Sequence, residues 1–288
     1  MIPAPFGYTR AGSVDEALAA LAADDGAKVI AGGQSLLPLM KLRFARPAHV
    51  IDIGRIPGLD YVKEEGGVLK IGALAREAAL EASAVVREKY PILADTAAVI
   101  ADPLVRNLAT VCGNLAHGDP ANDHPATMLA LGAEVVATGP KGARTIPIAQ
   151  FFTGLFSTAL AADEILTEIR IPAPPAGSGG AYVKLERKVG DFATAGAAAF
   201  LVIKGGRIER AGIGLTAMGP VPVKAAEAEK SLAGKAPDEA AFAEAGRLAA
   251  AATRPTADRR GAVDYKKEMA RVLTVRALRK AAQRAGGK

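Results

Sequence analysis

Two stretches rich in small residues have the composition of ligand-binding turns. The first, VIAGGQSLLP at 29–38, leaves an apolar run and passes through a Gly-Gly pair directly into Gln34 and Ser35. The second, NLATVCGNLAHGDPANDHP, spans 107–125. Glycine adopts positive φ and lets another group approach the main chain closely, so consecutive amides can converge on an anion. Two such turns, far apart in the sequence, could clamp the two phosphates of one dinucleotide.

Neither turn is specific alone, because Gly-Gly after a strand is most often just a turn. The named nucleotide-binding motifs are absent from the sequence. No G-x-G-x-x-G follows a predicted strand, since Gly212, Gly214 and Gly219 have the wrong spacing, and no G-x-x-x-x-G-K-[ST] occurs. The sequence therefore disfavours a Rossmann dehydrogenase and a P-loop NTPase.

The two stretches together resemble a known pair of signatures. AGGQSLLP at 31–38 and TVCGNLAHGDPANDHPA at 110–126 resemble the flavin-binding signatures of the FAD-carrying medium subunit of molybdenum hydroxylases, the carbon monoxide dehydrogenase and xanthine dehydrogenase family. The pairing about eighty residues apart is specific, and the resemblance covers essentially the whole chain. One departure is Cys112, which stands in the first glycine position of the family's T-x-G-G-N.

The resemblance implies an electron-transfer subunit of an oxidoreductase. FAD would bind non-covalently between the first two domains of this chain. A large partner subunit would hold the molybdenum cofactor and a small one the [2Fe-2S] clusters, in a dimer of heterotrimers. Electrons would pass from the clusters through FAD to an external acceptor. The substrate would be chosen by the molybdenum subunit, and Gln34, where some carbon monoxide dehydrogenase chains carry histidine, slightly favours another hydroxylase.

Two other functions are compatible with the sequence. Cys112 motivates a scaffold subunit of the same assembly that has lost its flavin. The alternative is a stand-alone flavin oxidoreductase that turns over without partners.

The resemblance also implies which residues contact the cofactor. Asp123 matches the aspartate that binds the ribose region of the nucleotide, although it could instead be a helix N-cap. Phe192 would lie over the isoalloxazine, near Lys184, whereas Ile100 and Leu166 match apolar positions beside the cofactor and suit a core equally well. The full predicted set is Val29, Ile30, Ala31, Gly32, Gly33, Gln34, Ser35, Leu36, Ile100, Ala109, Thr110, Val111, Cys112, Gly113, Asn114, Asp123, Leu166, Lys184 and Phe192.

Other residues of the second stretch could suggest metal or nucleophilic chemistry. His117 and His124 flank Asp119 and Asp123, but no third ligand follows at helical spacing. We therefore predict solvated loop histidines and no metal site. Cys112 has no base placed beside it by the sequence. We predict no catalytic residue in this chain.

The composition is that of an ordinary globular protein. The chain has 288 residues, 50% hydrophobic and 23% charged, enough for two or three domains. No run of about 18 apolar residues occurs, and the N-terminus, MIPAPFGYTR, lacks the layout of a signal peptide. We expect a cytoplasmic protein with no transmembrane segment. The single cysteine excludes an internal disulfide and any cysteine-ligated cluster within the chain.

The charge does not indicate a nucleic-acid partner. A net charge of +6 would permit one, but the basic residues are spread out. The chain has no tryptophan, and no basic patch is interleaved with aromatic residues. We therefore expect no nucleic-acid binding.

The elements that would position the two stretches form an α+β chain. A first domain, 1–55, has a capping box at Ser13, a helix to 23, strands at 28–31 and 50–53, and a helical turn at 36–44. A second domain, 56–175, opens with a hairpin of 59–63 and 68–71. Its other elements are helices at 74–82, 84–89, 92–100 and 126–131 and strands at 133–138 and 165–171, with the second stretch interrupting the regular structure.

A third domain, 176–288, follows a linker rich in proline and glycine at 172–180. Strands at 181–187, 195–204 and 207–217 predict a three-stranded antiparallel sheet, on which a helical bundle packs, with helices at 223–232, 238–252 and 264–284. The resemblance implies that the first two domains are a two-part, PCMH-type FAD-binding α/β region and that the third is the C-terminal domain of the medium-subunit flavoproteins.

Overall fold

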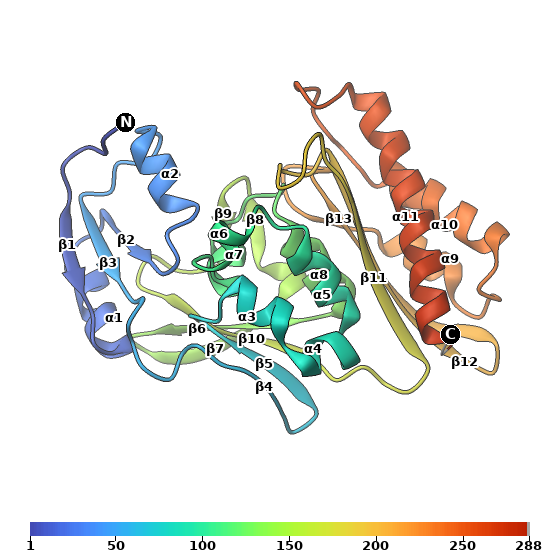
Figure 1. Cartoon of the computed structure of the whole chain (residues 1–288), viewed down its shortest axis with the longest axis horizontal. Helices are drawn as coiled ribbons and strands as arrows, with labels where there is room; N and C mark the ends of the chain where they lie inside the picture. The colour runs from blue at the N-terminus through green and yellow to red at the C-terminus, as the bar shows by residue number, and fades with distance from the viewer. Residues whose placement is uncertain (287–288) are drawn as a thin grey trace.

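Three main sheets lie one after another along an elongated α+β molecule, and β8 (Phe152–Gly154) and β9 (Ser157–Thr158) form a fourth sheet of two short strands (Figure 1). The computed structural model describes residues 1–286. The N-terminal sheet is at one end, a five-stranded sheet with its helices lies in the middle, and a four-stranded sheet with a helical layer is at the other end. The predicted fold class is confirmed, while the domain boundaries at 55 and 175 stay a prediction. No helix within 1–286 is long and apolar enough to cross a membrane.

The first sheet is parallel, with the order β1-β3-β2. Its elements are β1 (Gly7–Arg10), α1 (Val14–Ala22), β2 (Ala27–Ile30), α2 (Leu36–Lys41) and β3 (His49–Asp52). Ser13 caps α1 as predicted, because its Oγ accepts a hydrogen bond of 3.1 Å from Glu16 N. The first glycine stretch thus joins β2 to α2, at the carboxyl end of a strand.

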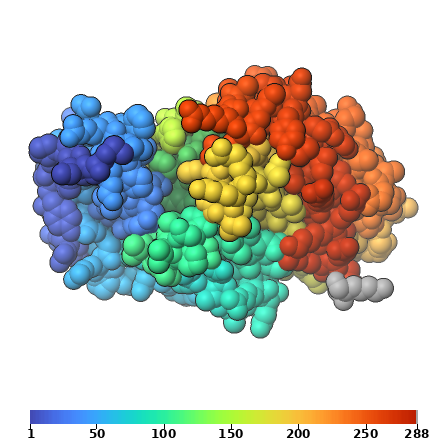
Figure 2. Space-filling model, turned by 45° about the horizontal axis from the view of Figure 1, so that its top comes forward, coloured from blue at the N-terminus to red at the C-terminus, as the bar shows by residue number. Residues whose placement is uncertain are grey.

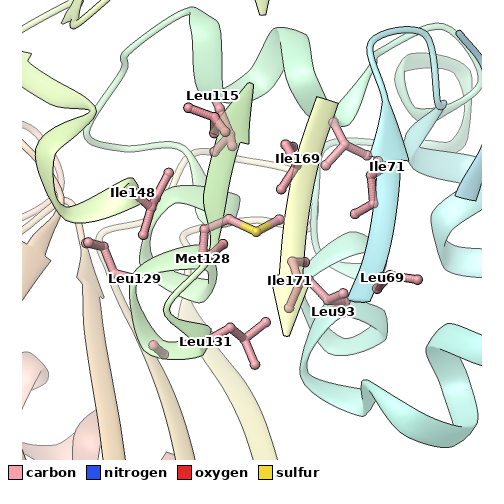
Figure 3. Packing of buried hydrophobic residues seen from close by; sticks show 14 of the residues in the cluster. Leu69, Ile71, Leu93, Leu115, Met128, Leu129, Leu131, Ile148, Ile169 and Ile171 are labelled. Carbon is pink, nitrogen blue, oxygen red and sulfur yellow. The ribbon is translucent and has the colours of Figure 1, made fainter. Parts of the chain in front are cut away.

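The second sheet is antiparallel, with the order β4-β5-β10-β6-β7. Its strands are β4 (Val62–Glu65), β5 (Val68–Gly72), β6 (Glu134–Gly139), β7 (Gly142–Pro147) and β10 (Ile165–Pro172). The helices packed on it include α3 (Glu77–Ala82), α4 (Ala84–Lys89), α5 (Pro91–Ala98) and α8 (Asp123–Leu131). Figure 3 shows Met128 and Leu93 from these helices beside Ile169 and Ile171 of the sheet, in one buried cluster.

The sequence did not predict β7 or the small elements that follow it. These are the 3-10 turn Ile148–Gln150 and the strands β8 (Phe152–Gly154) and β9 (Ser157–Thr158). Among the six residues of β7, Ile146 alone is buried. An edge strand of this kind has no alternation of apolar and polar residues by which to recognise it.

The second glycine stretch is more helical than predicted. Within 107–125, where an interruption of the regular structure was expected, α7 (Val111–Ala116) and the first turn of α8 form, and α6 (Pro103–Arg106) directly precedes the stretch. Thr110 Oγ1 accepts a hydrogen bond of 3.1 Å from Gly113 N, and Asp102 caps α6 in the same way. Threonine and aspartate favour both turns and helix N-caps, and here the capping role prevailed.

The C-terminal sheet has the order β11-β12-β13-β14. The elements are β11 (Ser178–Leu185), β12 (Ala195–Lys204), β13 (Arg207–Thr216), β14 (Val223–Lys224), α9 (Ala226–Leu232), α10 (Glu239–Ala251) and α11 (Val263–Ala285). The three predicted strands are joined by β14, which was predicted as helix. Val223 pairs with Leu215 at this edge, so the helix begins three residues later.

Two glycines let α8 lie directly on β13. All nine residues of α8 are buried. A Cβ on Gly212 would overlap the carbonyl oxygen of Ala130, and a Cβ on Gly214 would overlap that of Ala126. Residues two apart on a strand and four apart on a helix each share a face, so the two contacts form one seam. These glycines, which did not fit a nucleotide motif, join the second sheet's helices to the third sheet.

We predict that Gly214→Val lowers the free energy of unfolding by about 3 kcal/mol, because the side chain would force α8 away from β13. The exposed Glu209 of the same strand supplies the control, since Glu209→Val should change stability by less than about 0.5 kcal/mol. Urea unfolding followed by circular dichroism measures both. Equal losses in the two variants would contradict the packing role of Gly214.

Candidate functional site

The two glycine stretches line one cavity of about 390 Å³. Figure 2 shows this face of the molecule hollowed between the blue N-terminal part and the green and gold parts. The cavity brings together many of the predicted contact residues. These are all of 29–36, Ala109, Thr110, Cys112, Gly113, Asn114 and Leu166.

The first stretch touches the second through the main chain. A Cβ on Gly32 would overlap the Leu108 carbonyl oxygen and would lie 2.9 Å from Ala109 Cα. Gly33 has φ +74°, a conformation that glycine adopts without strain. Gln34 Nε2 donates to Gly32 O at 3.1 Å and holds the turn together. Gly32 thus permits close contact between the two units, and Gly33 provides the positive φ that the turn requires.

The second stretch is held in place from its other side by the start of α3. Arg76 Nη1 donates to Leu108 O, Glu77 N donates to Ala109 O at 3.0 Å, and Val111 N donates to Ala75 O at 3.1 Å. A Cβ on Gly113 would overlap Thr110 Oγ1, so glycine is required beside the capping threonine. The segment is therefore fixed between the N-terminal turn and α3.

Asn114 presents a buried polar atom at the cavity. Its carbonyl oxygen accepts a hydrogen bond of 2.9 Å from Asn122 Nδ2. Its side-chain Oδ1 is buried and has no hydrogen-bond partner within residues 1–286. A buried acceptor normally has a partner, so an unpartnered Oδ1 on a residue that lines the cavity is unusual.

Cys112 fits the family's glycine position because its side chain points into the core. The residue is 2% exposed, and Sγ lies 3.5 Å from Gly72 O. Burial raises the pKa of the thiol well above its ordinary value, and the carboxylates of Glu168 and Glu77 raise it further. A buried thiol of raised pKa is a poor nucleophile.

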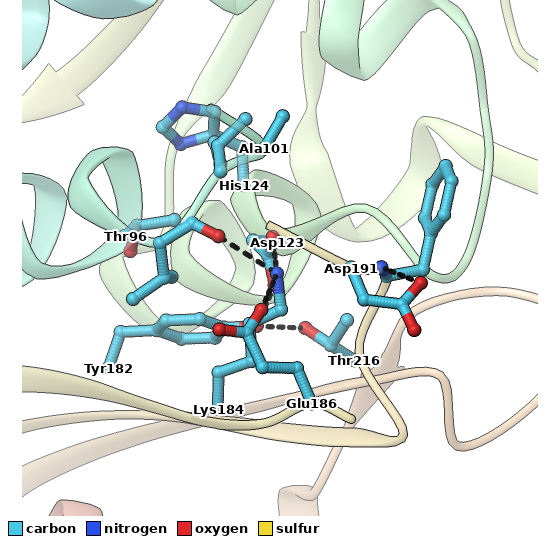
Figure 4. A network of polar contacts seen from close by, with 12 residues as sticks. Thr96, Ala101, Asp123, His124, Tyr182, Lys184, Glu186, Asp191 and Thr216 are labelled. Carbon is cyan, nitrogen blue, oxygen red and sulfur yellow. Dashed lines mark hydrogen bonds and ion pairs between the residues drawn. The ribbon is translucent and has the colours of Figure 1, made fainter. Parts of the chain in front are cut away.

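Five predicted contact residues lie outside the cavity lining, and their contact with a cofactor stays a prediction. Val111 and Ile100 are buried. Asp123 and Lys184 form an ion pair of 3.0 Å, and Tyr182 Oη donates to the second Asp123 oxygen at 2.6 Å (Figure 4). Burial raises the pKa of Asp123, whereas Lys184 and the Tyr182 hydrogen bond lower it. The cap of α8 is Asn122, and Asp123 is the first helical residue.

The fifth, Phe192, is half-exposed in the loop between β11 and β12. Its main-chain N donates to Asp191 Oδ1 at 2.8 Å. Hydrogen bonds from Arg260 and Arg187 lower the pKa of Asp191 to about 2. These contacts fix the loop to the segment before α11.

The prediction of solvated histidines was wrong for His124, which is fully buried with Nε2 2.7 Å from Glu77 Oε2. His117 lines the cavity, and its ring centroid lies 5.2 Å from that of Phe156. Burial lowers the pKa of His117, although the nearby Asp119 carboxylate acts in the opposite direction. His124 therefore lies in the interior, whereas His117 is partly buried at the cavity wall.

The sequence missed several residues of the lining. Phe156 comes from the β8–β9 turn, where its φ of +53° is rare for a side chain of this size. Of the missed set, Lys28 and Leu39 flank the first stretch, and Ala116 and His117 lie within the second, so these four could have been found from the two motifs. The missed residues are Lys28, Leu39, Ala45, Ile53, Ala73, Ala116, His117, Phe156, Leu160, Glu164 and Ile165.

The lining suits a dinucleotide with an apolar ring system. Glycine turns give close approach to main-chain amides at one part of the wall, and Leu39, Ile53 and Leu160 contribute apolar surface elsewhere. Lys28 is the one lysine or arginine of the lining, so main-chain donors would bind a phosphate. A volume of about 390 Å³ is within the range of ligand sites. The residues present therefore fit FAD.

Comparisons with known proteins identify the family of this chain. Residues 4–174 match the FAD binding domain in molybdopterin dehydrogenase, and 180–281 match the CO dehydrogenase flavoprotein C-terminal domain. The carbon monoxide dehydrogenase medium chain of Afipia carboxidovorans is 45% identical over 286 residues, 99% of both chains. A chain of carbon monoxide dehydrogenase from Hydrogenophaga pseudoflava superposes with a TM-score of 0.96 at 47% identity, covering 99% of both chains. A chain of quinoline 2-oxidoreductase from Pseudomonas putida 86 superposes with a TM-score of 0.93 at 34% identity, again covering 99% of both chains.

We predict that Cys112 of the native chain reacts with a disulfide reagent roughly 100-fold or more slowly than in the urea-unfolded chain. Burial excludes the reagent, and the raised pKa keeps the sulfur protonated as pH rises from 7 to 9. Absorbance of the released thiolate gives both rates, and the unfolded chain is the control because it carries the same sulfur. Equal rates would show an accessible thiolate.

Proposed function

We propose the function of this chain from its family, since it belongs to the FAD-binding medium subunits of molybdenum hydroxylases, in the carbon monoxide dehydrogenase and xanthine dehydrogenase group. In our proposal the chain receives electrons from [2Fe-2S] clusters of a small partner subunit. A large partner subunit holds the molybdenum cofactor and oxidises the substrate. The electrons leave this chain to an external acceptor, and the assembly is a dimer of heterotrimers.

The observation that carries the proposal is the meeting of the two glycine stretches at one cavity. They belong to separate units of the fold, and Gly32 permits main-chain contact between them. The residues that would hold FAD are the turn of 32–35, the start of α7 at Thr110 and Gly113, and Asn114, whose buried Oδ1 lacks a partner within 1–286. Leu166 and the apolar side chains beside it would cover the ring system.

When bound, FAD can exchange either one or two electrons, which suits a link between one-electron clusters and a two-electron acceptor. The chain itself binds, orients and excludes water. The carboxylate of Glu164, which lines the cavity, is paired with Arg144 at 2.6 Å. Burial lowers the pKa of His117, which also lines the cavity.

We also propose that Asp123, Lys184 and Phe192 bound the site on the side of the C-terminal sheet. Support comes from Asn122, which adjoins Asp123 and donates to the cavity residue Asn114. In this proposal the choice of substrate lies outside this chain. Carbon monoxide dehydrogenase and quinoline 2-oxidoreductase differ in substrate, yet chains of both superpose on this one over 99% of their length.

Purification of the full chain, alone and with its partner subunits, tests the proposal. We expect a yellow protein that binds one FAD and that turns over substrate in the assembly but not alone. A colourless chain that still assembles would favour a flavin-free scaffold. Turnover by the isolated chain would favour a stand-alone flavin oxidoreductase.

We predict that Gly33→Asp weakens FAD binding about 100-fold or more, because a carboxylate would stand among amides that bind phosphate. Gly33→Asn is the matched control. It has nearly the same shape and tolerates positive φ, so a loss of about tenfold or less is expected from it. Titration of the flavin-free chain, followed by flavin fluorescence, gives both dissociation constants. Equal loss in the two variants would attribute the effect to shape and not to charge.

A further inference from the structure

Glu77 and His124 form a buried pair that the proposed electron transfer does not use. Both side chains are fully buried, and His124 Nε2 lies 2.7 Å from Glu77 Oε2. Within residues 1–286, neither Glu77 Oε1 nor His124 Nδ1 has a hydrogen-bond partner. The two side chains are therefore directed at each other, between the start of α3 and the first turn of α8 (Figure 4 shows His124).

The pair connects the two ends of the second glycine stretch. The main-chain N of Glu77 donates to Ala109 O at 3.0 Å, where the stretch enters the cavity. The side chain of Glu77 contacts His124, which follows the part of the stretch that lines the cavity. Residues 109–124, which contain α7 and the lining residues Thr110, Gly113 and Asn114, are thus closed into a loop by Glu77.

A pair of this kind is a costly way to gain stability. Burial of two polar groups carries a desolvation penalty, and apolar replacements are often equally stable. Closure of a loop, however, reduces the conformations open to the chain between its ends. The Glu77–His124 contact is therefore better explained by its effect on the position of α7 than by a gain in folding stability.

We propose that Glu77 and His124 are positioning residues that hold α7 against the Gly32 turn and thereby set the affinity for FAD. Neither residue lines the cavity. The inference rests on the proposed function, in which FAD occupies that cavity. A second contact supports it, because Asn122, two residues before His124, donates to Asn114 O at 2.9 Å.

The chain offers a matched control in the same helix. Thr96 Oγ1 and Thr127 Oγ1 are 2.7 Å apart, and both residues are fully buried. This pair joins α5 to the middle of α8, and neither threonine links the two ends of residues 109–124. Removing the Thr96–Thr127 hydrogen bond tests whether the loss of any buried polar contact weakens FAD binding.

The experiment compares the double variants Glu77→Leu/His124→Leu and Thr96→Val/Thr127→Val with the wild-type full chain. Removing both partners leaves no unpaired buried group, so both variants should fold. We expect the first to bind FAD about tenfold more weakly and the second to bind it like wild type. In the flavin-free chain, amide hydrogen exchange in 111–116 should rise about tenfold in the first variant alone.

Glu77→Gln provides a test that does not depend on apolar packing. Glutamine keeps the length of the side chain and one hydrogen bond to His124, so FAD affinity should stay within about twofold of wild type. Wild-type affinity and exchange in the Leu/Leu variant would overturn the inference, as would equal effects in the Thr control. If the wild-type chain binds no FAD, the proposed function fails, and exchange in 111–116 still decides the role of the pair.

Discussion

The cavity depends on one close contact, between Gly32 and the main chain of residues 108–109. A side chain at position 32 would overlap the Leu108 carbonyl oxygen, so the N-terminal sheet could not approach the second unit as it does. The two glycine stretches belong to different units, and their contact closes one side of the space that they line. A steric constraint at a single backbone position thus determines whether two sequence motifs form one site.

The helix α8 transmits this arrangement to the rest of the molecule. It is buried along its whole length, and it contacts β13 through Gly212 and Gly214. Its first turn carries Asp123, paired with Lys184 of the C-terminal sheet, and His124, paired with Glu77 of α3. The adjacent residues Asp123 and His124 therefore pair with two different parts of the fold. The C-terminal unit, although remote from the glycine turns in sequence, is in this way joined to the segment that lines the cavity.

The strongly periodic and capped segments were predictable from sequence, and the irregular ones were not. Ser13 marks the start of α1, and long alternating or apolar runs gave β11 to β13 and the helices that follow. Weak, exposed edges such as β7 and β14 carry too few buried residues to produce a pattern. Thr110 and Asp102 show a second difficulty, because the residues that favour turns also cap helices.

The sequence by itself determined the two glycine stretches, the α+β order of elements and, through resemblance, the flavin as ligand. Close backbone approach and positive φ are local requirements, and they leave a local mark in residue type. Only the tertiary structure decided that Cys112 points into the core, that His124 is buried against Glu77, and that Phe156 reaches the cavity. Side-chain direction and long-range pairing depend on how separate units pack, and no short stretch of sequence records that packing.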